Sequence, residues 1–112
     1  MTAARVDVAV EGGLVRIAVG GEVDLANATA VEEQIVAAIT NQVTCVSVDL
    51  GEVEYIDSAG LRIFFSLVPR LAALQIALEL VAPVGSPSRR VVEVSGLASL
   101  VPLQPSLDGA AG

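Results

Sequence analysis

Two strand-type runs joined by Gly12-Gly13 open this chain. The run from Arg5 to Glu11 alternates in a way that is typical of a half-buried β-strand. Its apolar side is formed by Val6, Val8 and Val10. The run from Leu14 to Val19 also alternates, and Gly20-Gly21 is expected to end it. Because a glycine pair between two such runs favours a tight turn, the pattern predicts a β-hairpin.

After the hairpin, helix-type and strand-type patterns alternate. The predicted helices run from Ala28 to about Thr40, from Ser58 to about Ala73 and from Pro87 to about Val94, and the predicted strands are Val43–Leu50, Ile76–Val81 and Leu100–Leu103. Asn27 is expected to cap the first helix, and Gly96 to stop the third. The order β-β-α-β-α-β-α-β predicts an α/β domain with a mixed sheet of four or five strands and helices packed on it.

The second predicted helix is apolar along most of its length. Its inner face is predicted to consist of Leu61, Phe64, Phe65, Val68 and Ala72. Pro69 lies inside the span, and it is expected to kink the helix or to end it at Val68.

The length of 112 residues predicts one domain, which we place at residues 1–103, followed by a disordered tail at residues 104–112. The apolar stretches are interrupted by charged residues or proline before they reach the ~18 residues that a membrane helix needs. The first residues lack the pattern of a signal peptide. We therefore expect a cytoplasmic protein without membrane contact.

The charged residues exclude several classes of function. The net charge is −7, with six arginines and no lysine, so a nucleic-acid partner is not expected. The chain has no histidine, which removes the commonest general base and metal ligand. The single Cys45 lies within a predicted strand, where we expect an inert buried thiol. We predict no enzymatic activity, no cofactor and no metal.

One junction is a candidate site. Asp57-Ser58 follows a predicted strand and loop and opens a helix, with Ser58 at or beside its N-cap. Most serines at such positions are helix caps. The small Ala59 and Gly60 that follow would let another backbone approach closely, but small residues in a first helical turn can also be incidental.

Glu22 and Asp24 follow the preceding strand, and they would lie at the same end of the sheet if the two strands are parallel neighbours. Six acidic residues of these two segments are either ordinary charged loop residues or members of an acidic patch around Ser58: Glu22, Asp24, Asp49, Glu52, Glu54 and Asp57. A carboxylate pair or cation site at Asp24 and Asp57 is a further alternative.

Three short motifs resemble those of the STAS family, the sulfate-transporter and anti-sigma-factor-antagonist domains. Gly21-Glu22-Val23-Asp24 resembles its Gly-Glu-Leu-Asp element, and Asp57-Ser58-Ala59-Gly60-Leu61 resembles its Asp-Ser-Ser/Ala-Gly-Leu element. Ser95-Gly96-Leu97 resembles its late Ser/Thr-Gly-Leu element. The motifs occur in order on the expected elements, so the resemblance covers Val6 to about Leu103.

The resemblance implies a regulator of transcription. Free-standing members of this length bind an anti-sigma factor with a serine-kinase fold related to histidine-kinase ATPases, and this binding releases the sigma factor. The kinase phosphorylates the serine that here is Ser58, which switches the antagonist off, and a serine phosphatase resets it. The implied partner-binding residues are Glu22, Asp24, Asp57, Ser58, Ala59, Gly60, Leu61 and Arg62. Arg62 stands where the family often has a small residue, which bears on partner choice.

Two alternatives remain open. The chain could be a STAS-type docking subunit of a lipid-transport ATPase or of a stress-sensing complex, neither of which requires phosphorylation. A small α/β domain could also be an enzyme or bind a nucleotide, but the sequence has no phosphate-binding loop and no base that could activate Ser58.

Overall fold

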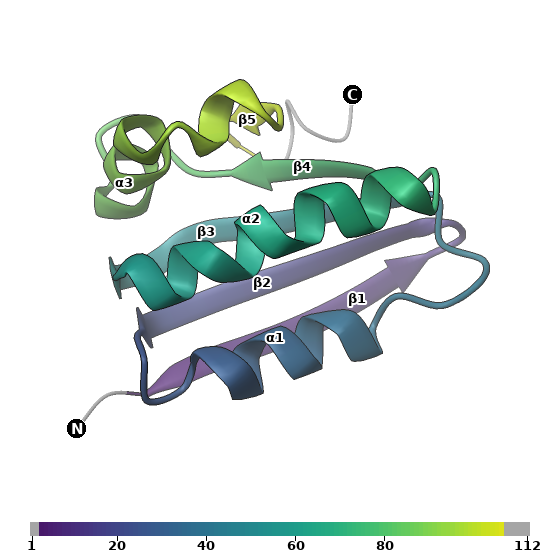
Figure 1. Ribbon diagram of the computed structural model, residues 1–112, viewed down its shortest axis with the longest axis horizontal. Helices are drawn as coiled ribbons and strands as arrows, with labels where there is room; N and C mark the ends of the chain where they lie inside the picture. Colours follow the sequence, from purple (N-terminus) through teal and green to yellow (C-terminus); the bar gives the residue numbers. More distant parts are fainter. Residues whose placement is uncertain (1–2, 107–112) are drawn as a thin grey trace.

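The computed structural model describes residues 3–106. These residues form β1 (Ala4–Glu11), β2 (Leu14–Val23), α1 (Ala28–Ala37), β3 (Cys45–Ile56), α2 (Ser58–Ala73), β4 (Ala77–Val81), α3 (Pro87–Ser95), a short 3₁₀ helix (Leu97–Ser99) and β5 (Leu103–Gln104) (Figure 1). The predicted order of strands and α-helices is confirmed.

The strands form a single mixed sheet in the order β1-β2-β3-β4-β5. β1 pairs antiparallel with β2, whereas the pairs β2–β3, β3–β4 and β4–β5 are parallel. The predicted hairpin is confirmed, since Glu11 pairs with Leu14 across the two glycines. Gly12 has φ = +59°, a conformation that glycine adopts without steric cost at the first position of a tight hairpin turn.

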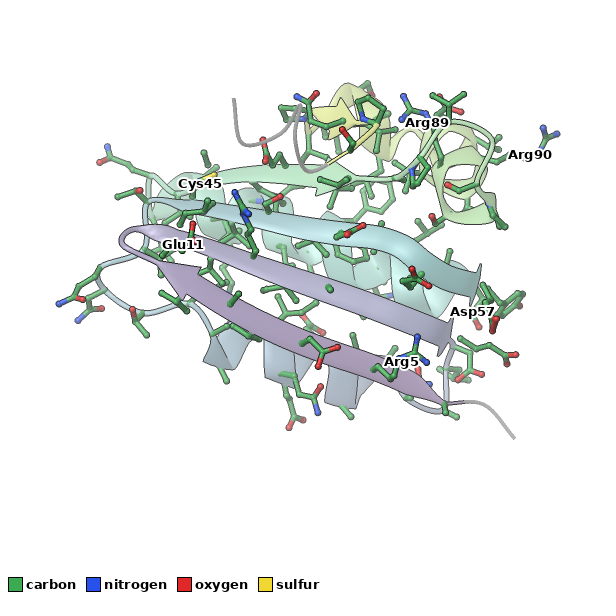
Figure 2. All side chains as sticks on the ribbon, turned by 180° about the vertical axis from the view of Figure 1, so that it is seen from behind. Arg5, Glu11, Cys45, Asp57, Arg89 and Arg90 are labelled. Carbon is green, nitrogen blue, oxygen red and sulfur yellow. The ribbon has the colours of Figure 1, made fainter. Side chains whose placement is uncertain are left out.

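The sheet is covered by helices on one face. α1 and α2 lie side by side in front of the strands in Figure 1, and α3 lies beyond β4, against the end of β3. The view from behind shows the strands uncovered (Figure 2). Small and charged side chains occupy this open face, among them Arg16, Ala18, Ser47, Asp49 and Glu79.

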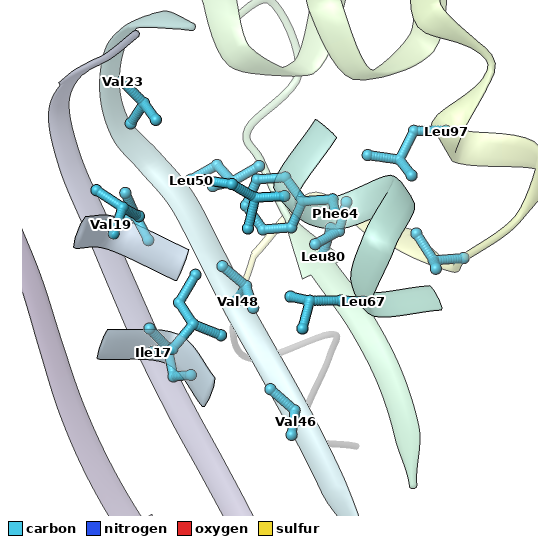
Figure 3. Close-up of a cluster of buried hydrophobic side chains, with 14 of the residues drawn as sticks. Ile17, Val19, Val23, Val46, Val48, Leu50, Phe64, Leu67, Leu80 and Leu97 are labelled. Atoms are coloured by element: carbon cyan, nitrogen blue, oxygen red, sulfur yellow. The ribbon is translucent and has the colours of Figure 1, made fainter. Parts of the chain in front are cut away.

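The hydrophobic core lies between the sheet and the helices. β2 contributes Val15, Ile17 and Val19, and the helix-facing residues of β3 are Val46, Val48 and Leu50. Phe64 and Leu67 of α2 pack on them, and Leu97 closes the cluster below α3 (Figure 3). Burial of such aliphatic side chains contributes about 1.5–3 kcal/mol each, so this layer accounts for much of the fold's stability.

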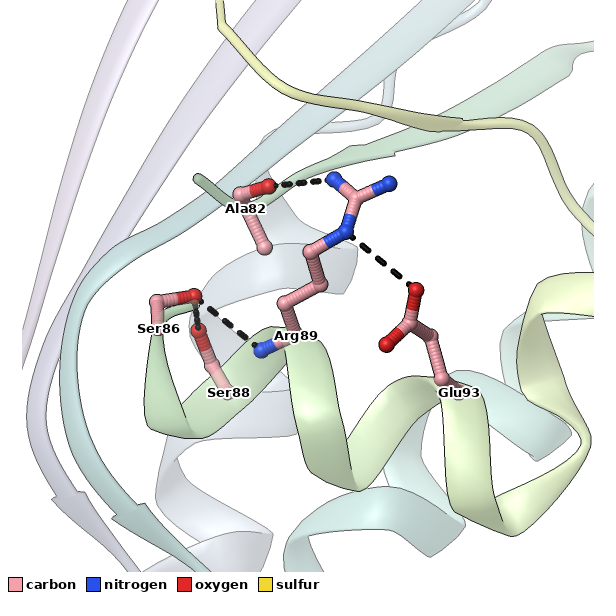
Figure 4. Close-up of polar contacts among 5 residues, drawn as sticks. All are labelled: Ala82, Ser86, Ser88, Arg89 and Glu93. Atoms are coloured by element: carbon pink, nitrogen blue, oxygen red, sulfur yellow. Dashed lines mark hydrogen bonds and ion pairs between the residues drawn. The ribbon is translucent and has the colours of Figure 1, made fainter. Parts of the chain in front are cut away.

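Hydrogen bonds attach α3 to the sheet. The Ser88 hydroxyl is buried and donates to the Leu50 carbonyl over 2.8 Å. Arg89 donates from its guanidinium to the Ala82 carbonyl over 2.7 Å and pairs with Glu93 at 3.3 Å (Figure 4). Ser86 caps the helix by accepting from the Arg89 backbone N–H. The helix ends as predicted, because Gly96 adopts the left-handed conformation with φ = +89°.

Several predicted boundaries are wrong. β2 continues through Gly20-Gly21 to Val23, and β3 extends to Ile56 where a loop was expected. α1 ends at Ala37 rather than near Thr40. The last strand is Leu103–Gln104, because the preceding residues first form the 3₁₀ helix. The predicted tail therefore begins with a strand residue, Gln104, while residues 107–112 lie outside the described residues, so disorder there stays a prediction.

The inner face of α2 was predicted only in part: Phe64 is buried as predicted, Leu61 and Val68 are half-buried, and Phe65 and Ala72 are exposed. Its buried residues are Gly60, Ile63, Phe64, Leu67 and Leu71, whereas Phe65 is 38% exposed. The helix is apolar on most sides, so spacing alone did not identify the buried stripe. The helix continues through Pro69 to Ala73 instead of ending at Val68.

β1 is less buried than its alternation predicts. Val6 is half-buried, but Val8 and Val10 are 46% and 62% exposed. Both valines belong to an edge strand, which has a neighbouring strand on one side only.

Candidate functional site

The two strand-to-helix junctions meet at one end of the sheet. Val23 and Ile56 are register partners at the last positions of β2 and β3. The Asp57 N–H donates to the Val23 carbonyl over 3.2 Å, so the junctions are joined by the backbone. The parallel pairing that we made a condition for this arrangement is present.

Two irregularities in the β2–β3 pairing allow both strands to continue to this end of the sheet. Between Ala18 and Gly20 of β2, and again between Gly21 and Glu22, β3 advances by one residue more than β2 does. Such bulges absorb an extra residue without ending the strand. The glycines therefore lie within the ladder instead of closing it, which is why the strand boundaries were misplaced.

Asp57 is the N-cap of α2. Its carboxylate accepts hydrogen bonds from the backbone N–H groups of Ala59, at 2.9 Å, and of Gly60, at 3.1 Å. Two of the first N–H groups of the helix are thereby satisfied by one side chain. The capping function, which the sequence left open for Ser58, thus belongs to Asp57.

Ser58 is the first residue of α2, and its side chain is exposed. Within residues 3–106 its hydroxyl takes part in no hydrogen bond. Because the neighbouring aspartate caps the helix, the Ser58 hydroxyl is not needed for capping and lies at the surface.

Gly60 is buried and permits close packing of α2 on the sheet. A Cβ at this position would lie 2.6 Å from the Ile56 Cγ1 atom and 3.0 Å from the Val23 Cγ1 atom. Glycine therefore lets the first turn of the helix approach the ends of both strands. Direct contact between Gly60 and a partner stays a prediction.

The loop after β2 is held by Asn27, a residue that the sequence assigned a different role. Asn27 makes no side-chain cap for α1. Its Nδ2 instead donates to the Glu22 carbonyl over 2.8 Å, and its Oδ1 accepts from the Asp24 N–H over 3.0 Å. Asparagine has both a donor and an acceptor, so it can fix a loop on two sides. The position of Asn27 just before the helix favoured a cap, in which its side chain would bond to residues that follow it. The observed hydrogen bonds go to residues that precede it.

A groove of about 160 Å³ lies between the first turns of α1 and α2. It is lined by Leu25, Ala28, Thr29, Glu32, Ala59, Arg62, Ile63 and Ser66. Leu25 is 79% exposed at the rim of this groove, and sequence reasoning missed it. Arg62 is exposed, whereas Leu61 is half-buried and packs against the core.

The six acidic residues do not all gather around Ser58. Glu22, Asp24 and Asp57 lie at the ends of β2 and β3, and Glu52 and Glu54 lie on the last part of β3. Asp49, however, lies in the middle of β3, roughly 20 Å from Ile56 at ~3.3 Å per residue. It accepts from the Gly51 N–H on the open face of the sheet, so it does not belong to an acidic patch around Ser58.

The thiol of Cys45 lies at the opposite end of the sheet from Ser58, and it is half-buried rather than fully buried. Burial, with a further contribution from the Glu79 carboxylate, raises the pKa of the Cys45 thiol above its ordinary value. A raised pKa lowers the fraction of reactive thiolate. Within residues 3–106, no group of three or more histidine, cysteine or acidic side chains could hold a metal ion, and no helix there has the length and apolar character for a membrane crossing.

Comparison with known proteins identifies the family. The model of the STAS domain matches residues 5–110. The anti-sigma-F factor antagonist RsfB of Mycobacterium tuberculosis is 34% identical over 92 residues, which cover 82% of this chain and 74% of RsfB. The crystal structure of an anti-sigma factor antagonist from Mycobacterium paratuberculosis superimposes with a TM-score of 0.86 at 29% identity, over 97% of this chain and 92% of that chain.

The unphosphorylated form of the anti-sigma factor antagonist SpoIIAA shares the fold at 24% identity, with a TM-score of 0.73 over 96% of this chain and 93% of that chain. The predicted resemblance is therefore confirmed at the level of sequence and of fold. This chain belongs to the STAS family and, within it, to the anti-sigma factor antagonists.

Proposed function

We propose that this protein binds an anti-sigma factor with a serine-kinase fold and thereby releases a sigma factor, and that phosphorylation of Ser58 by the same partner switches it off. A serine phosphatase restores the active form. The protein is a regulator without catalytic activity of its own, and the proposal places it in the cytoplasm, where transcription takes place. The names of its antagonist relatives support the anti-sigma factor as the class of partner.

The observation that supports the switch is that Asp57 and Ser58 have different roles at the start of α2. Asp57 supplies the cap with its carboxylate, so the Ser58 hydroxyl is exposed and unengaged by residues 3–106. A kinase can reach this hydroxyl without unwinding the helix. Modification also leaves the cap intact, so the folded domain survives it.

A phosphate at this position acts mainly across an interface. It adds about −1.5 to −2 charges. At the N-terminus of α2 this charge interacts favourably with the helix dipole, by about 0.3–1 kcal/mol, so it does not unfold the domain. It does, however, place a dianion beside Asp57 and near Asp24, where a docked partner would have to bury it.

The surface around Ser58 supports docking by a protein rather than binding of a small molecule. Leu25 presents an exposed apolar side chain at the rim of the groove, and Arg62 adds a positive charge on the neighbouring turn of α2. Arginine is enriched among the residues that anchor protein interfaces, and an exposed apolar side chain beside it adds surface that a partner can bury.

A kinase assay tests the proposal. The protein is incubated with ATP and each candidate anti-sigma factor of the same cell, and phosphate is located by mass spectrometry. We expect phosphate on Ser58, lost in Ser58→Ala and retained in Ser99→Ala, which removes an exposed serine outside the groove. Absence of phosphate with every candidate would contradict the switch and would favour a constitutive docking subunit of a transport or stress-sensing assembly.

A further inference from the structure

The groove beside Ser58 continues along the outer surface of the protein between α1 and α2. A second hollow of about 370 Å³ follows the first, and both are lined by Thr29 and Glu32. The two helices lie side by side, with their N-terminal ends at the same end of the sheet (Figure 1). The residues that line the second hollow are Thr29, Glu32, Glu33, Val36, Ala37 and Arg70. We call the two hollows together the α1–α2 groove.

The α1–α2 groove has an apolar floor and small side chains along its walls. Ala28 and Ile63 are buried, and Val36 is half-buried. Ala59 and Thr29 are short side chains at the sides of the groove. The distance at which a helix packs depends on the side chains at the contact, so short ones allow another helix to approach closely.

Four charged side chains line the same groove. Arg62 and Arg70 belong to α2, whereas Glu32 and Glu33 belong to α1. Within residues 3–106 none of the four takes part in an ion pair, although charges of opposite sign stand on opposite walls. The two walls therefore offer unpaired charges of opposite sign to an occupant of the groove.

The walls of the α1–α2 groove favour a helix as occupant. An extended peptide needs partners for its own N–H and C=O groups, such as the edge of a sheet supplies. α1 and α2 offer helical backbone, whose groups are bonded within each helix. A helix satisfies its own backbone groups, so side-chain contacts with the groove are sufficient to bind it.

We propose that the α1–α2 groove binds a helix of the anti-sigma factor, which carries acidic side chains towards α2 and basic side chains towards α1. This inference rests on the proposed function, and it extends the interface from Ser58 to Arg70, about 18 Å along α2. Arg62 and Arg70 are about 12 Å apart along the helix axis, which matches acidic residues seven or eight positions apart on the partner helix. The charges of the groove thereby select among anti-sigma factors.

Charge reversal at the far end of the groove tests the proposal. The probe is the anti-sigma factor that binds the wild-type protein in calorimetric titration. Arg70→Glu and Glu33→Arg should each raise its Kd by about tenfold or more. Both variants should also raise the KM for phosphorylation of Ser58 and leave kcat nearly unchanged, because they lie far from the hydroxyl. Arg90→Glu makes the same change of charge at an exposed position of α3 and should bind as wild type does.

A bulky side chain in the groove provides a second test. Thr29 is exposed and lines both hollows, so Thr29→Trp should occupy the space of the partner helix and weaken binding. Its thermal unfolding should stay close to that of wild type, since no buried contact is lost. Gln34→Trp adds the same side chain at an exposed position of α1 outside the groove and should leave binding intact.

The outcomes distinguish the groove from the proposed function. If an anti-sigma factor binds wild type, and Arg70→Glu, Glu33→Arg and Thr29→Trp bind it equally well, the groove is not the docking site although the antagonism stands. If the control variants lose as much affinity as the groove variants, the effect is not specific to the groove and the proposal is wrong. If no candidate binds wild type, the proposed function fails and the groove proposal fails with it.

Discussion

The hydroxyl of Ser88 donates a hydrogen bond of 2.8 Å to the carbonyl of Leu50, joining α3 to the central strand β3 across 38 residues of sequence. Both groups lie in the interior, where an unsatisfied polar group destabilises the fold by about 1–3 kcal/mol. We expect Ser88→Ala to lower the free energy of unfolding by that amount, measured by urea denaturation. Ser99→Ala, at an exposed serine, should change it by less than about 0.5 kcal/mol. Equal effects of the two variants would contradict a structural role for this bond.

The cap of α2 gives a second prediction. Asp57→Ala removes the acceptor for the N–H groups of Ala59 and Gly60, and it should destabilise the protein by about 0.5–2 kcal/mol in thermal unfolding. Asp57→Asn keeps an acceptor oxygen and should remain much closer to wild type. If the two variants were equally destabilised, the loss would come from the charge rather than from the hydrogen bonds.

Gly60 is predicted to be sensitive to a single added methyl group. Gly60→Ala places a Cβ 2.6 Å from the Cγ1 atom of Ile56, and such overpacking destabilises a core by about 1–3 kcal/mol. In the double variant Gly60→Ala/Ile56→Ala the clash is relieved, so the double variant should be less destabilised than the sum of the two single variants. Additive effects in this double-mutant cycle would mean that the two residues do not interact.

Cys45 is expected to make the protein less stable at alkaline pH. Because burial and Glu79 raise the pKa of the folded thiol, the unfolded chain loses its proton first as the pH rises. The contribution of the protonated thiol is therefore complete below the ordinary thiol pKa and is lost as the pH rises through the raised value. Urea midpoints should fall more between pH 7 and pH 10 in wild type than in Cys45→Ala. A parallel fall in both proteins would argue against the raised pKa.

Ser58 variants should separate binding from folding. Ser58→Ala is expected to bind the anti-sigma factor, whereas Ser58→Asp should weaken binding by at least about 100-fold, which corresponds to ~3 kcal/mol. Far-UV circular dichroism should be the same for both, because the Asp57 cap is retained. Equal affinities would contradict the switch, and a loss of helix in Ser58→Asp would mean that unfolding weakens the complex instead.

The order of elements could be predicted from sequence because each element has a clear local pattern. The boundaries depended on contacts that a linear pattern does not contain. Glycine pairs end many strands, but Gly20 and Gly21 lie beside bulges, and the pairing of β2 with β3 continues past them. The exposure of Val10 follows from the edge position of β1, which its own alternation does not reveal.

The candidate site was predicted in outline from its motifs. Asp57 and Ser58 were correctly placed at the start of a helix, but which of them caps it depends on the direction of one carboxylate. Asn27 was misassigned because its side chain bonds to the preceding loop. Asp49 was grouped with the other acidic residues because it is near them in sequence. A loop was expected after Leu50, but the chain continues as an extended strand, which keeps Asp49 far from Asp57.

The conformation of Gly21 has a practical consequence for experiments with tagged protein. Its φ is +85°, and a Cβ at this position would lie 2.2 Å from the Ala3 carbonyl oxygen, so glycine lets residue 3 lie against the end of β2 that carries Glu22. That same carbonyl accepts the Glu22 N–H over 2.9 Å. An affinity tag fused ahead of Ala3 therefore adjoins the surface on which a partner is expected to dock.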